Sequence, residues 1–244
     1  IRVFEKNMLL DKLKELNKMR IILGSGSPRR KDILNNIGLN FEIIPSKFDE
    51  NLDKRKYTVN EYVMETSKQK GLDILNTQLS INKYPDLIIS ADTVVYINNK
   101  ILEKPKSVKH AKEMLQLLSN NIHQVSTGVT LIKPNNINNN KPDIHTFCQT
   151  TQVHFAQLND QLIDSYLETK ESMDKAGGYG MQSIGAMFVK KIDGCYFNVV
   201  GFPLQKFCQE LRLFLNFDKN NKHKINLDNQ ISNEPPKKKR KVEG

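Results

Sequence analysis

A segment at residues 23–34, "LGSGSPRRKDIL", gathers side chains that suit the binding of an anion. Ser25 and Ser27 supply hydroxyl groups, and Arg29 and Arg30 supply two adjacent guanidinium groups. Guanidinium groups bind phosphate and carboxylate oxygens through paired hydrogen bonds. The glycine spacing matches neither the Walker-type phosphate loop nor the dinucleotide fingerprint. The segment indicates either an anion site of another type or a solvated turn whose arginines point away.

The same segment predicts the elements that would position these groups. Residues 21–23 are aliphatic and predict a buried strand, and Pro28 suits the first position of a following helix. Ser27 would be the N-cap, and the helix would end near Gly38. Both arginines then fall in the first turn, where the helix dipole disfavours cations unless an anion is bound. This conflict is a clue to an anion site, and the segment by itself leaves the anion site and the solvated turn equally open.

A second candidate is Asp92, which interrupts the apolar run "LIISADTVV". A buried carboxylate is costly without a partner or a metal, so this residue suggests chemistry, although it could also bond a neighbouring backbone group. Its candidate partners are Glu50, Lys70, Lys104 and Lys175. Together these groups could provide an acid, a base and phosphate ligands.

Alternating strand-like and helix-like segments predict an α/β fold around a twisted mixed β-sheet. Helical patterns occupy residues 1–18, 59–75, 107–118 and 159–171. Strand patterns occupy residues 41–46, 86–97, 101–105, 123–132 and 146–158, with an Asn-Asn turn after residue 97 and an Asn-rich exposed loop at 133–143. Six of the 12 glycines lie within residues 177–201, which predicts tight turns or close backbone approach.

The formal net charge of +10 would suggest nucleic-acid binding if it lay on one face of the fold. Residues 216–244 carry eight Lys or Arg against four Asp or Glu, and they include the basic run "PPKKKRKV" at 235–242. This polar segment predicts a disordered tail. No interleaving of aromatic and basic residues accompanies the charge, which argues against a nucleic-acid-binding module. We therefore expect a helical extension at 1–18, one folded domain at 19–215 and the tail at 216–244.

Cysteine usage and hydropathy indicate the compartment. Cys148, Cys195 and Cys208 are odd in number and lack C-x-x-C spacing, which argues against a disulfide framework and a zinc site. No apolar run approaches the length of a membrane span, and no secretory signal pattern opens the chain. We expect a cytoplasmic protein without a membrane partner.

Several blocks together resemble the Maf family of nucleoside triphosphate pyrophosphatases over residues 20–212. The blocks are "SGSPRR", "FDE", "SKQK", "ADTVV", "LEKP", "LSNNIHQVSTGV" and "MDKAGGYGMQ...GCYFNVVGFPL", in the family's order and approximate spacing. The segments "DKAGGYG" and "VVGFPL...FC" look most like the corresponding sequence in the Maf domain of eukaryotic acetylserotonin methyltransferase-like proteins. The resemblance implies a two-lobed, inosine triphosphatase-like fold with a central cleft, and a homodimer.

The resemblance also implies roles for individual residues. Asp92 would accept a proton from water, and Glu50 would help it hold a divalent ion such as Mg²⁺, Mn²⁺ or Co²⁺. The remaining residues would bind or neutralise the nucleotide: Ser25, Ser27, Arg29, Arg30, Lys70, Thr93, Lys104, Lys175 and Gln182.

The preference for particular substrates is the most specific of these expectations. The block "DKAGGYGMQ" resembles that of family members acting on dTTP and UTP, and the amide of Gln182 could pair with the edge of a uracil or thymine ring. Tyr179 could stack on the base or pack under the glycine turns, and His123 is expected to be structural. We expect a house-cleaning pyrophosphatase; the alternative is a non-catalytic nucleotide sensor that regulates cell division. The basic run resembles a viral nuclear import signal, so an import receptor is a possible partner.

Overall fold

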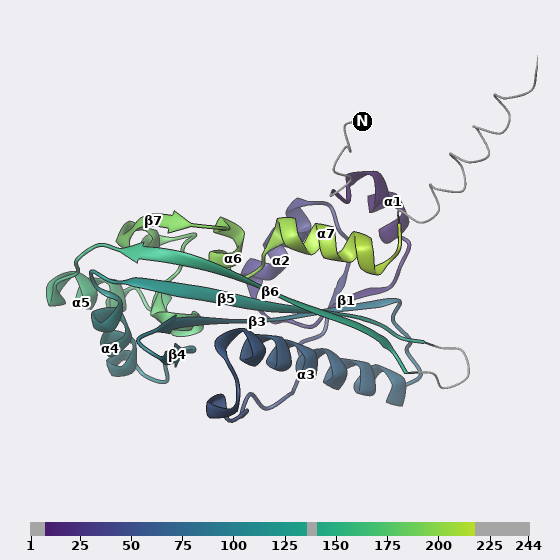
Figure 1. Cartoon of the computed structure of the whole chain (residues 1–244), viewed down its shortest axis with the longest axis horizontal. Helices are drawn as coiled ribbons and strands as arrows, with labels where there is room; N and C mark the ends of the chain where they lie inside the picture. Colours follow the sequence, from purple (N-terminus) through teal and green to yellow (C-terminus); the bar gives the residue numbers. More distant parts are fainter. Residues whose placement is uncertain (1–7, 136–140, 218–244) are drawn as a thin grey trace, which may run out of the picture.

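The structure is a computed structural model that describes residues 8–135 and 141–217. The expected α/β class is confirmed, because a seven-stranded mixed sheet has helices on both faces (Figure 1). The strands are β1 (Ile21–Leu23), β2 (Glu42–Ile43), β3 (Leu87–Ile97), β4 (Lys100–Leu102), β5 (Ile122–Lys133), β6 (Asp143–Phe155) and β7 (Val189–Asp193). The α-helices are α1 (Leu13–Leu16), α2 (Pro28–Asn36), α3 (Val59–Ser80), α4 (Val108–Leu118), α5 (Asp160–Glu168), α6 (Tyr196–Val200) and α7 (Leu204–Phe214). Short 3-10 turns are η1 (Leu10–Lys12), η2 (Lys54–Lys56), η3 (Glu171–Asp174), η4 (Ala176–Gly178) and η5 (Ile184–Phe188).

The strand order is β2-β1-β3-β5-β6-β7, and β4 pairs with β3. β1 runs parallel to β2 and β3, whereas the remaining pairs are antiparallel. α3 covers one face of the sheet, α2 and α7 cover the other, and α4 and α5 lie at one end (Figure 1). Parallel strands need long crossover connections: α2 lies between β1 and β2 in the chain, and α3 lies between β2 and β3.

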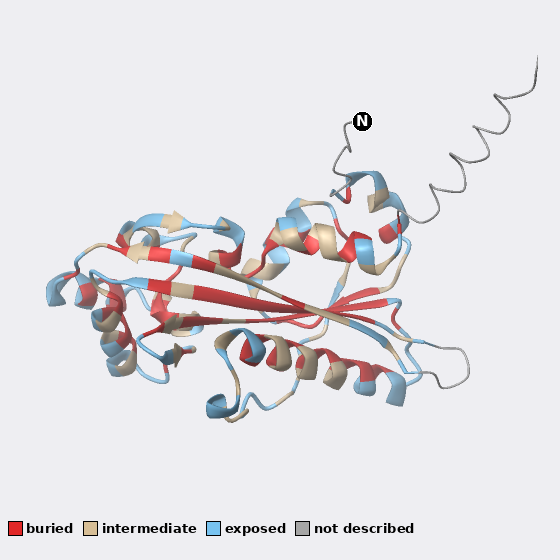
Figure 2. Cartoon of the chain, viewed as in Figure 1, coloured by how far each residue is buried: buried red, intermediate tan, exposed pale blue. Residues whose placement is uncertain are grey.

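Two core clusters share the same long strands. The larger cluster includes residues of β1, α2 and α7, and the second includes residues of α4 and α5. β3 contributes Ala91 to the first and Val95 to the second, and β5 contributes Val129 and Val125 in the same way. Buried positions therefore continue along these strands (Figure 2). The two lobes are halves of one sheet.

Local signals correctly predicted the boundaries of several elements. α2 begins at Pro28 with Ser27 as its N-cap, although the Ser27 hydroxyl makes no capping hydrogen bond. α5 follows Asn159, whose side chain accepts from the Leu162 N–H. The β3–β4 hairpin turns at Asn98 and Asn99, both at positive φ.

Other boundaries differ from the sequence prediction. The strand expected at 41–46 pairs only over Glu42–Ile43, because its neighbour β1 is itself short. The described part of the expected helix at 1–18 is limited to η1 and α1, and Leu9 and Leu16 pack into the larger core cluster. Phe217, placed in the tail by composition, packs there too. Residues 136–140 of the Asn-rich loop and the basic run lie outside the described residues.

None of the helices in the described ranges is long and apolar enough to cross a bilayer.

Candidate functional site

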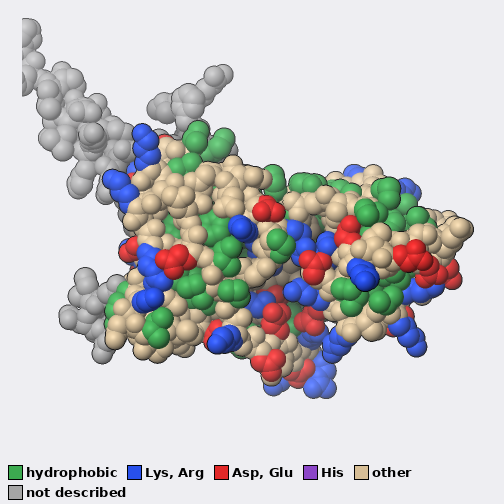
Figure 3. All heavy atoms as spheres, turned by 180° about the vertical axis from the view of Figure 1, so that it is seen from behind, with side chains coloured by type: hydrophobic (Ala, Val, Ile, Leu, Met, Phe, Trp, Pro, Cys, Tyr) green, Lys and Arg blue, Asp and Glu red, His purple; other side chains and the backbone are tan. Residues whose placement is uncertain are grey.

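The site lies where one edge of β3 has no neighbouring strand among the described residues. β1 pairs with residues 87–89 of β3, and β4 pairs with residues 95–97 of the same edge. The intervening stretch borders a cavity of about 570 Å³, a size typical of small-molecule sites. Basic and acidic side chains gather around a hollow near the middle of the molecule in Figure 3. The strand pattern thus exposes the centre of β3 to a ligand.

Asp92 points from β3 toward α3. It lies opposite Gly128 of β5 in the register, and a Cβ on Gly128 would collide with the α3 backbone at Val63 and Met64. Side chains directly opposite each other on antiparallel strands share a face, so Asp92 also faces α3. Lys70 of α3 meets it there with an Nζ–Oδ1 distance of 2.8 Å. Close packing of α3 on a glycine therefore makes this ion pair possible.

The Lys70 ammonium is shared between two carboxylates. Its Nζ lies 2.8 Å from Oδ1 of Asp92 and 2.8 Å from Oε1 of Glu50. Asp92 is 7% exposed, whereas Glu50 lies on an exposed loop. Two carboxylates that converge on one ammonium mark a position that favours a cation.

These two carboxylates fit a magnesium-type ion. Such ions take oxygen ligands, and they commonly use one or two protein carboxylates together with substrate phosphates and water. In the part of the chain that the structure describes, no cluster of three or more His, Cys, Asp or Glu could hold a metal by itself. Asp92 and Glu50 could therefore hold a divalent ion that arrives with a phosphate ligand.

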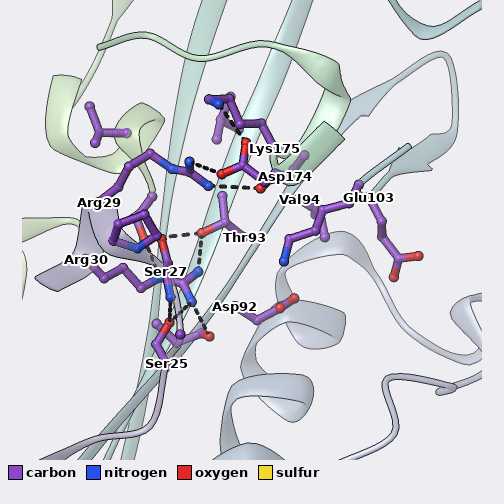
Figure 4. A pocket seen from close by; sticks show the side chains of 18 of the residues that line it. Ser25, Ser27, Arg29, Arg30, Asp92, Thr93, Val94, Glu103, Asp174 and Lys175 are labelled. Atoms are coloured by element: carbon purple, nitrogen blue, oxygen red, sulfur yellow. Dashed lines mark hydrogen bonds and ion pairs between the residues drawn. The ribbon is translucent and has the colours of Figure 1, made fainter. Parts of the chain in front are cut away.

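The Arg30 side chain is half-buried, and its guanidinium is bonded to the protein on several sides (Figure 4). It donates to Ser25 Oγ, Thr93 Oγ1 and the backbone oxygens of Ala91 and Gly201, each at 2.9 Å. These bonds tie the first turn of α2 to β3 and to the α6–α7 turn. Arg30 thus positions the residues on either side of Asp92, and its predicted contact with phosphate stays a prediction.

Arg29 reaches across the cavity to Asp174. Its Nη1 lies 2.7 Å from the Asp174 Oδ2, and its Nη2 donates to the Asp174 backbone oxygen at 3.0 Å. Lys175 bonds the other carboxylate oxygen, with Nζ 2.6 Å from Oδ1. These two cations hold the pKa of Asp174 at about 2, against the opposing effect of its burial. Two of the predicted phosphate ligands therefore share one protein carboxylate.

The structure brings ten of the eleven predicted site residues to the cavity wall: Ser25, Ser27, Arg29, Arg30, Glu50, Lys70, Asp92, Thr93, Lys104 and Lys175. The exception is Gln182, which is exposed and does not line the cavity; its neighbour Met181 does. Two further acidic residues, Asp174 and Glu103, line the cavity but were not predicted as site residues. Both stand within the quoted blocks "LEKP" and "MDKAGGYGMQ", beside Lys104 and Lys175, which is the signal that could have found them.

Tyr179 forms part of the cavity wall and packs beneath it. The side chain is 5% exposed, and its hydroxyl lies 2.8 Å from Nε2 of His123. Its ring meets His123 and Phe155 edge to face. Tyr179 thus packs against His123 and Phe155 while it lines the cavity, and the structural role of His123 stays a prediction.

Burial of His123 makes folding sensitive to acid. Desolvation, followed by the nearby His154, lowers the pKa of His123 from 6.5 to about 3. Between these pH values the unfolded chain binds a proton that the folded protein excludes, so stability falls as pH decreases. We expect this residue to lower the free energy of unfolding by ~2 kcal/mol between pH 7.5 and pH 5.

Urea denaturation across that pH range checks this prediction. The His123→Asn variant should show a shallower fall in unfolding free energy than the parent, because it lacks the titrating group. Parallel pH profiles for the two proteins would contradict it.

Comparison with known proteins adds independent information. Residues 20–214 match the family model described as "Maf-like protein". A dTTP/UTP pyrophosphatase of Clostridium perfringens is 44% identical over 79% of this chain and 96% of its own length. A nucleoside triphosphate pyrophosphatase of Dictyostelium discoideum is 44% identical over 77% of this chain and 87% of its own.

A human protein is similar over only part of its length. It is named as a probable bifunctional dTTP/UTP pyrophosphatase/methyltransferase, and it is 44% identical over 79% of this chain. The match spans 31% of the human protein. The present chain therefore corresponds to about a third of that relative.

Proposed function

Because this chain belongs to the Maf-like protein family, we propose that its cavity hydrolyses a nucleoside triphosphate to the monophosphate and pyrophosphate, with dTTP and UTP as preferred substrates. The observation that carries the proposal is the pair of carboxylates, Asp92 and Glu50, on one ammonium, in a cavity that further cations also line. This arrangement combines a proton acceptor with groups that neutralise phosphate. Relatives named for this activity cover nearly the whole of the folded region.

Different residues of the site have different roles in hydrolysing the bond between the α- and β-phosphates. Asp92 accepts a proton from the attacking water, whose oxygen forms a new bond to phosphorus. The bond between that phosphorus and the oxygen that bridges the α- and β-phosphates breaks, which separates the monophosphate from pyrophosphate. Arg29, Lys104 and Lys175 neutralise the phosphate chain, and Ser25 offers a hydroxyl to it. A divalent cation on Asp92 and Glu50, such as Mg²⁺, Mn²⁺ or Co²⁺, supplies charge neutralisation at the phosphate oxygens.

Pyrophosphate release from a panel of common and modified nucleoside triphosphates tests the proposal. The assay is run with magnesium, manganese and cobalt in turn, and the nucleotide product is identified. Monophosphate and pyrophosphate in equal amounts are expected. Nucleotide binding without turnover under all conditions would replace the enzyme with the nucleotide-sensing alternative.

Base selectivity is assigned to Gln182, whose amide can both donate to and accept from a pyrimidine edge. Since Gln182 lies just outside the cavity wall, this role requires the turn after Met181 to approach the ligand. The wild-type ratio of kcat/KM for UTP over GTP should exceed one. Gln182→Glu should lower that ratio by on the order of 5- to 150-fold, because a carboxylate cannot donate to the uracil O4.

The measurement is kcat/KM for UTP and GTP in the parent and the variant. Ser183→Ala, next to Gln182 in the same turn, is the matched control. A ratio unmoved by Gln182→Glu would remove this residue from base recognition.

We extend the proposal to the domains, partners and location of the chain. The pyrophosphatase domain comprises the expected residues 19–215 together with Leu9, Leu16 and Phe217, which pack into its core, and it forms a homodimer. The enzyme acts in the cytoplasm, and the run "PPKKKRKV" recruits a nuclear import receptor. A large reporter fused to the chain should lose nuclear enrichment when the run is deleted.

A further inference from the structure

Asp174 forms a bridge between the two walls of the cavity. Arg29 belongs to α2, whose Ile33 and Leu34 are in the larger core cluster. Asp174 ends η3, and Met173 beside it packs against the second cluster. The side chains of Arg29, Asp174 and Lys175 point toward one another in Figure 4. One carboxylate thus joins cations from opposite sides of the cavity.

Both carboxylate oxygens of Asp174 are used in this bridge, one by each cation, at 2.7 Å and 2.6 Å. Arg29 and Lys175 line the cavity with little exposure of their own, 20% and 12% of the side chain, whereas Asp174 is 55% exposed. The carboxylate can therefore move into water more easily than either cation can. Its pKa of about 2 keeps it fully ionised near neutral pH.

We propose that Asp174 is a specificity-determining residue that acts as an internal competitor for anions, occupying Arg29 and Lys175 until a polyphosphate displaces it. This inference rests on the proposed function, because Arg29 and Lys175 are there assigned to the phosphate chain. A ligand with several negative charges regains more electrostatic energy from these cations than a singly phosphorylated product does. Asp174 therefore favours a di- or triphosphate chain over the monophosphate product, and it retakes the cations when the phosphate chain leaves.

The Asp174→Asn variant tests this competition, since the amide keeps the shape but loses the charge. The dissociation constant of inorganic pyrophosphate is measured by calorimetry in magnesium buffer, and KM and kcat are measured for dTTP. We expect pyrophosphate to bind roughly 3- to 10-fold more tightly and KM to fall by a similar factor, because a partly exposed ion pair no longer has to be displaced.

Glu103→Gln is the matched control. Glu103 lines the same cavity, but its carboxylate pairs with Lys54 and Tyr62 rather than with Arg29 or Lys175. It should change pyrophosphate affinity less than twofold. A second measurement repeats Asp174→Asn in an Arg29→Ala background, where the gain in affinity should shrink because one contested cation is gone.

Unchanged or weaker pyrophosphate binding in Asp174→Asn would overturn the inference, since it would make Asp174 a support for Arg29. Equal tightening in Glu103→Gln would also overturn it, because the effect would then reflect the general charge of the cavity. The proposed function is refuted by a different result, a parent protein that hydrolyses no nucleotide. In that case the pyrophosphate affinity of Asp174→Asn relative to the parent still measures the competition.

Discussion

The Asp92→Asn variant should hydrolyse nucleoside triphosphates at least ~10²- to 10⁴-fold more slowly than the parent, the loss typical of removing a general base. The amide keeps the size of the side chain and can still accept a hydrogen bond from Lys70, whose Nζ lies 2.8 Å from the present carboxylate. It cannot accept the proton of the attacking water, and it is a poorer ligand for a divalent cation. Folding and nucleotide binding should therefore persist while turnover is lost.

Single-turnover hydrolysis and equilibrium binding of dTTP separate these effects. Asp164→Asn is a suitable control, because Asp164 is an exposed aspartate of α5 paired with Lys112 at 2.6 Å. The control should retain parental turnover. Turnover of Asp92→Asn within tenfold of the parent would refute the assignment of Asp92 as the proton acceptor.

Gly128→Ala should lower the free energy of unfolding by about 3 kcal/mol or more, at the upper end of the cost of overpacking. The added Cβ would overlap the Val63 carbonyl group and lie 2.7 Å from the Met64 nitrogen. These are backbone atoms of α3, which cannot rotate away, so the helix itself must move. Because Lys70 lies on α3, the displacement should also separate Lys70 from Asp92 and reduce turnover.

Urea unfolding and dTTP turnover are measured together for this variant. Gly26→Ala is the control for stability, since a Cβ there would meet Pro45 atoms no closer than 3.7 Å. The free energy of unfolding of this control should lie within about 1 kcal/mol of the parent's, because the new methyl group meets only ordinary contacts. A stability loss below about 1 kcal/mol for Gly128→Ala would contradict the close packing of α3 on β5.

Local sequence signals predicted the parts of the site that depend on near neighbours. Pro28 marked the start of α2, and the polar Asp92 within an apolar strand marked the centre of the cavity. The contacts that organise the site could not be predicted in this way. Arg30 bonds the backbone oxygen of Gly201, 171 residues away, and Arg29 bonds Asp174, 145 residues away.

The glycine-rich region shows a different limit of prediction. Gly177 and Gly178 have positive φ, and the chain forms successive short 3-10 turns rather than a periodic element. Helices and strands have a regular period that tells which way each side chain points, but these turns have none, so the sequence does not predict the direction of their side chains. Resemblance pointed to Gln182, whereas the structure places Met181 on the cavity wall.

The Arg30–Gly201 bond has a consequence for synthesis of the protein. A ribosome makes the chain from its N-terminus, so Glu50, Lys70 and Asp92 emerge long before Gly201 can close the turn that Arg30 holds. β3 pairs with β5 and β5 with β6, so the central sheet also waits for later residues. A chain interrupted in translation would therefore carry the reactive carboxylates without the cavity that uses them.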